Sequence, residues 1–287
     1  MENRNIQKVI LDIFKVFKDI CKKHNLTYFA IGGTCLGAIR HKGFIPWDDD
    51  MDVAMPYEDY KKFLKISEKE LKYPYSLLCP QKNKHWINLF IKIHNVQTTF
   101  IEDFYKNYPD SHYGIWLDVM PIFGLPKEKI KRKFLCKLAI LLLRQNKAYR
   151  YNLQEQNSLK EKILWLTTLP QKITQKPFYY FSNKIESKFS KFPFNSSSKI
   201  LCCWRNFPLF FYSYRTNYQQ ILEYKDFSST IEVPFEDTTI AIPIGYDNYL
   251  KMDFGDYMKL PPEEKRKPIH GDAIIDLENP YSFYQKN

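Results

Sequence analysis

The chain has 287 residues, of which 44% are hydrophobic, 17% aromatic and 26% charged, and its formal net charge at pH 7 is +11. This apolar content is enough for one sizeable core or two small ones, and it excludes a disordered tail, a collagen-like fibre and a small disulfide scaffold. The excess of Lys and Arg suits nucleic acid, anionic lipid or a phosphate-bearing substrate. Because the sequence has no RNA-binding signature, zinc-finger spacing or base-reading basic helix, we expect no nucleic-acid partner.

The first half of the chain predicts alternating helices and strands. Apolar residues at spacings of one, three and four predict an amphipathic helix over 6–21, with lysines on its other face. The next predicted elements are a buried strand over 28–31, a helix over 34–41, a strand over 48–54, a helix over 57–71, and strands over 86–94 and 115–119, the last closed by Pro121. This alternation predicts an α/β (α+β) core.

The rest of the chain carries fewer signals. Residues 127–191 are predicted to be helical, basic and motif-poor, and the following segments are aromatic-rich up to a Pro-rich end. We therefore expect an α/β core over 1–125, a helical insertion over 126–200, and a C-terminal segment over 201–287 that packs back on the core and completes its site.

Cysteine spacing and hydropathy indicate the compartment. None of the six cysteines forms a CxxC pair, which favours reduced thiols and disfavours a closed zinc site. The N-terminus lacks the apolar core of a signal peptide, and the longest apolar run, 138–143, is far shorter than the roughly 20 residues of a spanning helix. We expect a cytoplasmic protein, at most peripheral on the inner face of the membrane.

The aspartates between positions 48 and 52 are the most informative feature. Side chains two apart in a strand point the same way, so Asp48, Asp50 and Asp52 should share one face and Asp49 the other. Like charges on one face repel unless a cation lies among them, and hard divalent ions such as Mg²⁺ take oxygen ligands. The alternative is an acidic surface loop. We favour a metal site because apolar residues alternate with the acids, namely Trp47, Met51, Val53 and Met55.

Gly32 and Gly33 lie between the predicted strand and helix. Without side chains, they let backbone N–H groups approach a phosphate, and the helix N-terminus adds positive potential. We therefore expect Gly32, Gly33 and Thr34 to contact substrate. A glycine pair alone is a weak signal. The order strand, GG, helix, D-x-D-x-D is nevertheless the arrangement of nucleotidyltransferases, in which such a turn holds phosphates beside metal-binding carboxylates.

Segment 32–55, GGTCLGAIRHKGFIPWDDDMDVAM, resembles the signature of the LicD family, a group of phosphocholine transferases related to fukutin-type phospho-sugar-alcohol transferases. The similarity continues at 91–99, 114–121 and 249–270, while 127–225 carries little of it. It implies a nucleotidyltransferase-like fold, with a mixed sheet flanked by helices. It also implies transfer of a phospho-alcohol from a CDP-activated donor to a glycan hydroxyl.

The resemblance assigns roles to the acids. Asp50 and Asp52 match the family's metal pair, Asp48 lies alongside as a substrate contact, and Asp118 matches the acid on a neighbouring strand. We expect Asp50, Asp52 and Asp118 to hold Mg²⁺ or Mn²⁺, and CDP-choline to be the donor. A sugar hydroxyl would attack the distal phosphorus, Asp118 would accept its proton, and CMP would leave. A buried structural role next to Pro121 is the alternative for Asp118.

Four basic side chains are predicted to contact substrate. Arg40 is expected to pair with the donor diphosphate, with a surface position as the alternative. Arg266 is expected to contact an anionic acceptor and His270 to cap the pocket. Lys92 either points into the site, which we favour, or snorkels at the sheet edge.

Choline is a quaternary ammonium, which aromatic faces bind by cation–π attraction. Aromatic residues beside the motifs are candidates for such a cage, with a core role as the alternative: Trp86, Tyr113, Trp116 and Tyr257.

Other functions remain open at this level. The same fold could move ribitol phosphate, glycerol phosphate or a nucleotidyl group, a non-catalytic module could bind a nucleotide, or the basic segment 127–150 could dock on a membrane surface. The presence of all four acids favours an active enzyme. The expected acceptor is a glycan or lipid-linked glycan of lipopolysaccharide, teichoic acid or capsule.

Overall fold

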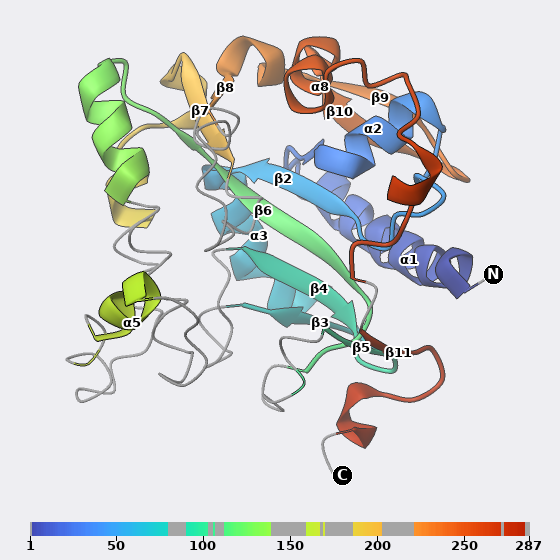
Figure 1. The fold of residues 1–287 in the computed structure, drawn as a ribbon. Helices are drawn as coiled ribbons and strands as arrows, with labels where there is room; N and C mark the ends of the chain where they lie inside the picture. Colours follow the sequence, from blue (N-terminus) through green and yellow to red (C-terminus); the bar gives the residue numbers. More distant parts are fainter. Residues whose placement is uncertain are drawn as a thin grey trace.

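A mixed sheet forms the centre of the molecule (Figure 1). The computed structural model describes residues 2–79, 90–102, 106, 112–138, 159–166, 169, 186–202, 221–270 and 273–284. The strands of this seven-stranded sheet follow the order β1 (Phe29–Ala30), β2 (Asp52–Pro56), β6 (Trp116–Gly124), β4 (Ile91–Asn95) and β3 (Tyr75–Leu78), with β7 (Lys199–Cys202) and β8 (Ile221–Glu223) added along the end of β6. β2 and β6 are parallel, and the other pairs are antiparallel. All nine residues of β6 are buried, so this strand is the core of the sheet.

Helices flank the sheet. Their bounds are α1 (Glu2–Lys23), α2 (Gly32–Arg40), α3 (Tyr57–Glu70), α5 (Leu159–Leu166) and α8 (Tyr246–Phe254), and residues 129–138 are also helical. α1 and α3 lie on the face of the sheet turned away from the viewer in Figure 1, where the rings of Phe17 and Phe63 pack edge to face at 5.2 Å between centroids. The mixed sheet with flanking helices confirms the predicted fold class.

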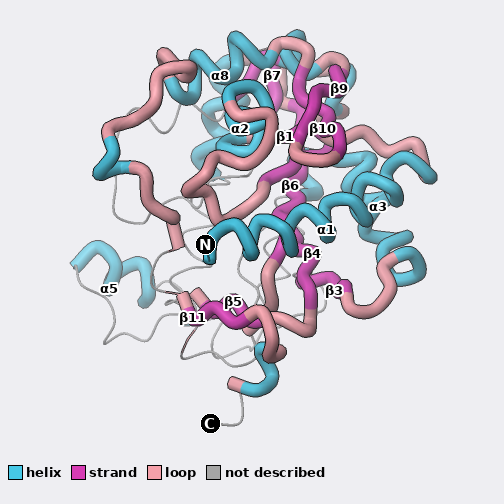
Figure 2. The backbone as a smooth tube through the Cα atoms, turned by 90° about the vertical axis from the view of Figure 1, so that its right-hand side faces the viewer, coloured by secondary structure: helices cyan, strands magenta, loops and turns pink. Residues whose placement is uncertain are grey.

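Segments from the C-terminal part lie against the N-terminal part. The hairpin of β9 (Thr230–Phe235) and β10 (Thr238–Pro243) lies beside β1, and α8 lies beside α2 (Figure 2). β11 (Ile274–Asp276) pairs with β5 (Thr99–Ile101) in a separate two-stranded sheet. Short 3₁₀ helices cover 194–196, 224–227, 263–265 and 281–283.

Several element boundaries differ from the sequence predictions, and those near the predicted site are the following. α2 begins at Gly32, so the glycine pair belongs to the first helical turn and does not precede it. β2 begins at Asp52, so residues 48–51 form a loop that leads into the strand. The predicted strand over 86–94 is β4, and its expected beginning, up to residue 89, lies outside the described residues.

The prediction that Pro121 closes its strand is wrong, because β6 continues to Gly124. Proline cannot donate a ladder hydrogen bond, so it is tolerated where no neighbour needs one. On one side of β6, pairing with β4 ends at Val119 and pairing with β7 begins at Ile122. Pro121 lies in the gap between these two partners, and the strand passes through it.

Cys21, Cys35 and Cys136 are free thiols, and Cys203 lies outside the described ranges. Within those same ranges, no helix combines the length and the apolar character needed to cross a bilayer.

Candidate functional site

Neighbouring strands bring the predicted acids together at the start of β2 and β6. Asp52 is the register partner of Asp118 in the parallel pair, and the Asp118 N–H donates to the Met51 carbonyl at 2.9 Å. Asp48 and Asp50 come from the loop of residues 41–51 directly before β2, which we call the acid loop. We call Asp48, Asp50, Asp52 and Asp118 the acid cluster.

The carboxylates of the acid cluster destabilise one another's charged forms. Burial raises the pKa of Asp48 and Asp52 well above the ordinary value, and the charge of Asp50 raises both further. Burial also raises the pKa of Asp118 to about 6, although the Lys92 ammonium opposes this shift. Such a group of buried and half-buried carboxylate oxygens has the chemistry that a hard divalent cation requires.

The spacing of the carboxylates adds to the predicted ligand set. In the described part of the chain, one group of three candidate ligands has its oxygens all within 4.8 Å of one another, and it consists of Asp48, Asp49 and Asp50. The carboxylate oxygens of the predicted set, Asp50, Asp52 and Asp118, do not all lie this close to one another. The loop before β2 therefore provides the closest approach of carboxylates, and Asp48 and Asp49 join the candidate ligands.

Asp49, which lies close to Asp48 and Asp50, also contacts the C-terminal segment. Its carboxylate accepts hydrogen bonds from the backbone N–H of Ile269 at 3.4 Å and of His270 at 3.2 Å, and it lies 3.0 Å from His270 Nδ1. Burial alone would raise the pKa of Asp49, but the bonds from His270 outweigh it and the pKa falls. These contacts place His270 over the acid loop, as a capping residue would lie.

Lys92 points into the site. It is the register partner of Asp118 on β4, and its Nζ lies 3.1 and 3.3 Å from the two oxygens of that carboxylate. The side chain is only 4% exposed, which excludes the alternative position at the sheet edge. Lys92 therefore places a positive charge beside the acid cluster within the protein itself.

The first turn of α2 also contacts the acid cluster. Gly32 has φ of +55°, a conformation that favours glycine, and its N–H donates to Tyr249 Oη at 2.7 Å. A side chain on Gly33 would place its Cβ 2.6 Å from Asp48 Oδ2, and Thr34 Oγ1 accepts from the Asp52 N–H at 2.8 Å. In this structure Gly32 and Thr34 thus bond within the chain, and Gly33 allows Asp48 to approach the helix.

Comparison with known proteins agrees with this arrangement. Residues 25–139 match the family described as LicD/FKTN/FKRP, nucleotidyltransferase domain. The chain is also 28% identical over 272 residues to the lipopolysaccharide cholinephosphotransferase LicD of Haemophilus influenzae. This match covers 93% of the present chain and 95% of the Haemophilus protein. Residues 25–139 are therefore similar to the LicD family domain. An uncharacterized protein of Rickettsia typhi is 31% identical over 117 residues, or 37% of each chain.

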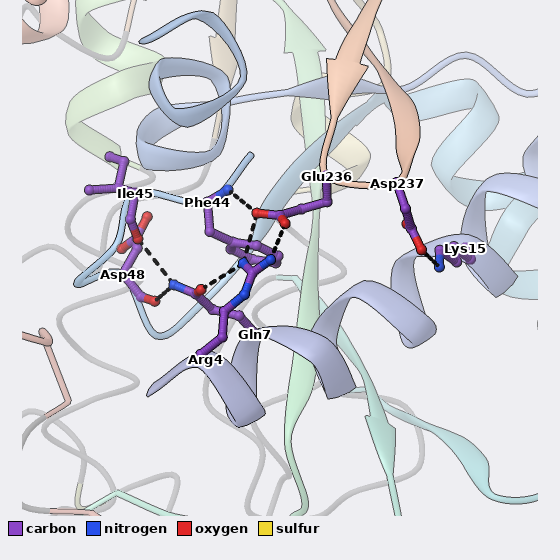
Figure 3. Close-up of polar contacts among 8 residues, drawn as sticks. All are labelled: Arg4, Gln7, Lys15, Phe44, Ile45, Asp48, Glu236 and Asp237. Atoms are coloured by element: carbon purple, nitrogen blue, oxygen red, sulfur yellow. Dashed lines mark hydrogen bonds and ion pairs between the residues drawn. The ribbon is translucent and has the colours of Figure 1, made fainter. Parts of the chain in front are cut away.

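Several contacts to the acid loop come from outside the matched LicD domain. Gln7 of α1 is 2% exposed, and its Nε2 donates to the carbonyls of Ile45 at 3.1 Å and Asp48 at 2.8 Å (Figure 3). Asn3 Nδ2 donates to the Asp48 carbonyl as well, at 3.0 Å. Sequence analysis missed these residues, although a glutamine on the apolar face of an amphipathic helix was a usable signal.

A second anchor is visible beside this one. Arg4 of α1 forms an ion pair with Glu236 in the β9–β10 turn, and Glu236 also accepts from the Phe44 N–H at 3.0 Å (Figure 3). On the same helix, Lys15 pairs with Asp237 at 2.7 Å. These contacts hold α1, the β9–β10 hairpin and the acid loop together.

The three aromatic candidates for the cage that lie in the described ranges are buried and contact other groups of the chain. Trp116 is 1% exposed and Tyr113 is fully buried. The Lys92 ammonium lies 3.5 Å from the centroid of the Trp116 ring, so the protein's own cation covers that face. Tyr257 is 9% exposed and its Oη bonds to Asp247 at 2.8 Å. Trp86 lies outside the described residues.

Arg40 and Arg266 lie near each other, and Arg266 contacts Trp47 of the acid loop. Arg40 Nη1 donates to the carbonyls of Tyr257 at 2.9 Å and Lys259 at 3.4 Å. Arg266 Nε donates to the Pro261 carbonyl at 2.9 Å, and the guanidinium carbon lies 5.7 Å from the centroid of the Trp47 ring. Neither arginine forms an ion pair with the acid cluster.

Proposed function

We propose that the protein is a divalent-cation-dependent transferase that moves phosphocholine from CDP-choline to a sugar hydroxyl of a cell-surface glycan. The acid cluster, in a segment similar to the LicD family domain, carries this proposal. The similarity to a lipopolysaccharide cholinephosphotransferase along almost the whole chain supports the choice of phosphocholine and of a glycan acceptor.

The proposed chemistry is an in-line displacement at the distal phosphorus of the donor. Asp50, Asp52 and Asp118 would hold Mg²⁺ or Mn²⁺, with Asp48 as a neighbouring ligand. When bound, the ion supplies neutralisation of the phosphate charge. The acceptor oxygen forms the new P–O bond, the bond to CMP breaks, and CMP leaves with the electron pair. Asp118 takes the hydroxyl proton, because its pKa of about 6 suits a base that works near neutral pH.

Lys92 has a positioning role in this scheme. Its ammonium lies against both oxygens of Asp118, which favours the ionised form of the carboxylate and fixes its orientation on β6. The packing of Lys92 against Trp116 holds the ammonium in place from the other side. The resulting arrangement presents Asp118 to the acceptor as a base.

The donor assay tests the proposal. Purified protein is incubated with a sugar acceptor and CDP-choline, CDP-ribitol or CDP-glycerol, in Mg²⁺, in Mn²⁺ or in EDTA, and CMP release is measured. We expect CMP release from CDP-choline that EDTA abolishes. Asp50→Asn and Asp52→Asn should each lower turnover at least about 100-fold, because a lost ligand removes several kcal/mol of charge stabilisation. Asp12→Asn, an equal charge change on the exposed side of α1, should not.

Full turnover in EDTA, or in both cluster variants, would contradict the metal-dependent mechanism. Release of pyrophosphate from a nucleoside triphosphate would indicate nucleotidyl transfer instead. A preference for CDP-ribitol or CDP-glycerol would leave the mechanism intact and reassign the donor. Because the described aromatic candidates are buried or hydrogen-bonded, this comparison of donors is the sharpest test of choline recognition.

The proposed location is the cytoplasmic side of the membrane, with peripheral contact to lipid. The helix over 129–138 supports this proposal. Exposed lysines occupy positions 127, 129, 131, 133 and 137, and two large apolar side chains lie among them, Ile130 at 86% and Phe134 at 65% exposure. Basic residues around exposed apolar side chains are typical of interfacial helices on anionic lipid. A lipid-linked glycan acceptor would be found at such a surface.

A further inference from the structure

Two arginines that are distant in the sequence meet on one side of the acid loop. Arg40 is the last residue of α2, and Arg266 follows the 3₁₀ helix over 263–265. Trp47 connects them: its ring lies 6.2 Å from the ring of His41, the neighbour of Arg40, and 5.7 Å from the Arg266 guanidinium. Arg40 Nε also approaches His41 Nδ1 at 3.4 Å. These contacts place the Arg266 guanidinium over Trp47 and the Arg40 guanidinium against His41, which packs on the same ring.

The positive charge of this pair is poorly balanced. Among the described residues, no carboxylate forms an ion pair with Arg40, whose polar contacts are carbonyl oxygens and the His41 ring. Arg266 has one acidic partner, Glu263 at 3.8 Å, and the Glu263 side chain is 90% exposed. An exposed pair at that distance contributes little. Burial and the charge of Arg266 lower the pKa of Arg40, which agrees with two cations that share one region.

The backbone places this region next to the proposed reaction centre. The segment that carries Arg266 onto Trp47 continues to His270, which binds Asp49. Trp47 and Asp49 flank Asp48, so one short stretch of the C-terminal segment lies along three consecutive residues of the acid loop. An anion beside four carboxylates is repelled unless nearby cations bind it. One guanidinium group can donate two parallel hydrogen bonds to the oxygens of a phosphate.

We propose that Arg40 and Arg266 together bind one phosphate group next to the acid cluster, with Trp47 as the wall of this subsite. The sequence alone assigned the two arginines to different substrates. The phosphate belongs either to the diphosphate of the donor or to a phosphorylated acceptor, and this choice of source rests on the proposed function. Binding of the phosphate group itself does not, because it needs neither turnover nor a metal ion.

Binding of inorganic pyrophosphate in EDTA tests the subsite directly. We expect saturable, salt-sensitive binding to the full chain by calorimetry. Arg40→Gln and Arg266→Gln should each weaken it about tenfold or more, as loss of a charge-assisted hydrogen bond predicts. Lys267→Gln, an equal charge change at the exposed neighbour of Arg266, should leave binding unchanged. Unaltered binding in the double arginine variant, or no saturable binding to the wild type, would overturn the subsite.

Conservative variants guard against a folding defect and identify the source. Arg40→Lys and Arg266→Lys keep the charge and lose the paired geometry, so we expect folded proteins with reduced pyrophosphate affinity. In the transfer assay, a raised KM for the CDP-activated donor assigns the phosphate to the donor, and a raised KM for the acceptor assigns it to the acceptor. Unchanged values for both, in an enzyme that turns over, would overturn the proposal. Without any turnover, pyrophosphate binding still decides the subsite, and the proposed function fails separately.

Discussion

Asp48 and Asp52 illustrate, at the level of single residues, a conflict between binding and folding. Burial and neighbouring carboxylates raise their pKa values well above the ordinary value. A raised carboxyl pKa means that the folded state favours the protonated form. Its contribution to stability is complete below the unfolded pKa, about 4, and is lost as the pH rises through the folded pKa. Without a bound cation, the acid cluster therefore lowers the free energy of unfolding at neutral pH.

Asp52→Asn should stabilise the metal-free protein. In EDTA at pH 7.5 we expect its Tm to lie about 2 °C or more above that of the wild type, because a buried charge among like charges is removed. At pH 5 the difference should shrink, since more of the wild-type carboxyl is protonated. Addition of Mg²⁺ should raise the wild-type Tm and leave the variant nearly unchanged. Thermal unfolding by circular dichroism, with Asp12→Asn as control, measures the Tm in all three conditions. A variant less stable than the wild type in EDTA at pH 7.5 would contradict this account.

At the level of elements, the acid loop depends on two segments from opposite ends of the chain. α1 holds the loop through Gln7 and Asn3, which donate to backbone carbonyls. The segment that ends at His270 holds the loop through the side chain of Asp49. The loop has no regular structure of its own before β2. Its conformation, and with it the position of Asp48, is therefore set by tertiary contacts.

Gln7→Leu tests the contribution of α1. The change leaves the Ile45 carbonyl without this donor in a buried position, so we expect a loss of about 1–3 kcal/mol in the free energy of unfolding. Mg²⁺ affinity should fall as well, because the Asp48 backbone loses one of its two side-chain donors. Urea unfolding and a magnesium titration of the folded variant measure the two effects. Asn5→Leu makes the same kind of change at an exposed position of α1 and should alter neither quantity. Equal effects of the two substitutions would argue against a positioning role for Gln7.

The local patterns of the sequence predicted the elements well and their interactions poorly. Apolar periodicity gave α1 and α3 nearly in full. The strand alternation predicted for the aspartates is wrong before Asp52, because Asp48, Asp49 and Asp50 lie in a loop and their carboxylate oxygens come close together. The contact between Gly32 and Tyr249 joins residues 217 positions apart, and that between Asp49 and His270 spans 221. No local pattern encodes such distances. The environment of Trp116 was missed for the same reason, because its cation comes from another strand.

At the level of the whole molecule, the acid cluster and the basic helix lie at opposite ends of β6 (Figure 1). Asp118 is near the beginning of the strand, and the helix over 129–138 follows its end. Docking through this helix would therefore hold the membrane away from the acid cluster. An acceptor anchored in lipid would need a glycan long enough to reach along the strand. Membrane binding and turnover of a soluble acceptor should accordingly be separable.

Lipid binding of the helix over 129–138 can be measured by sedimentation with vesicles. We expect the protein to sediment with phosphatidylserine-containing vesicles and not with pure phosphatidylcholine, and to be released by salt. Substitution of Lys129, Lys131 and Lys133 by Gln should weaken binding roughly 100-fold, at about 1 kcal/mol per lysine near an anionic surface. The same change at Lys61, Lys65 and Lys69, exposed on α3, removes equal charge and should have a much smaller effect. Turnover of a soluble acceptor should be unaffected in both triple variants. If the α3 variant lost as much binding as the first, net charge and not this helix would determine membrane contact.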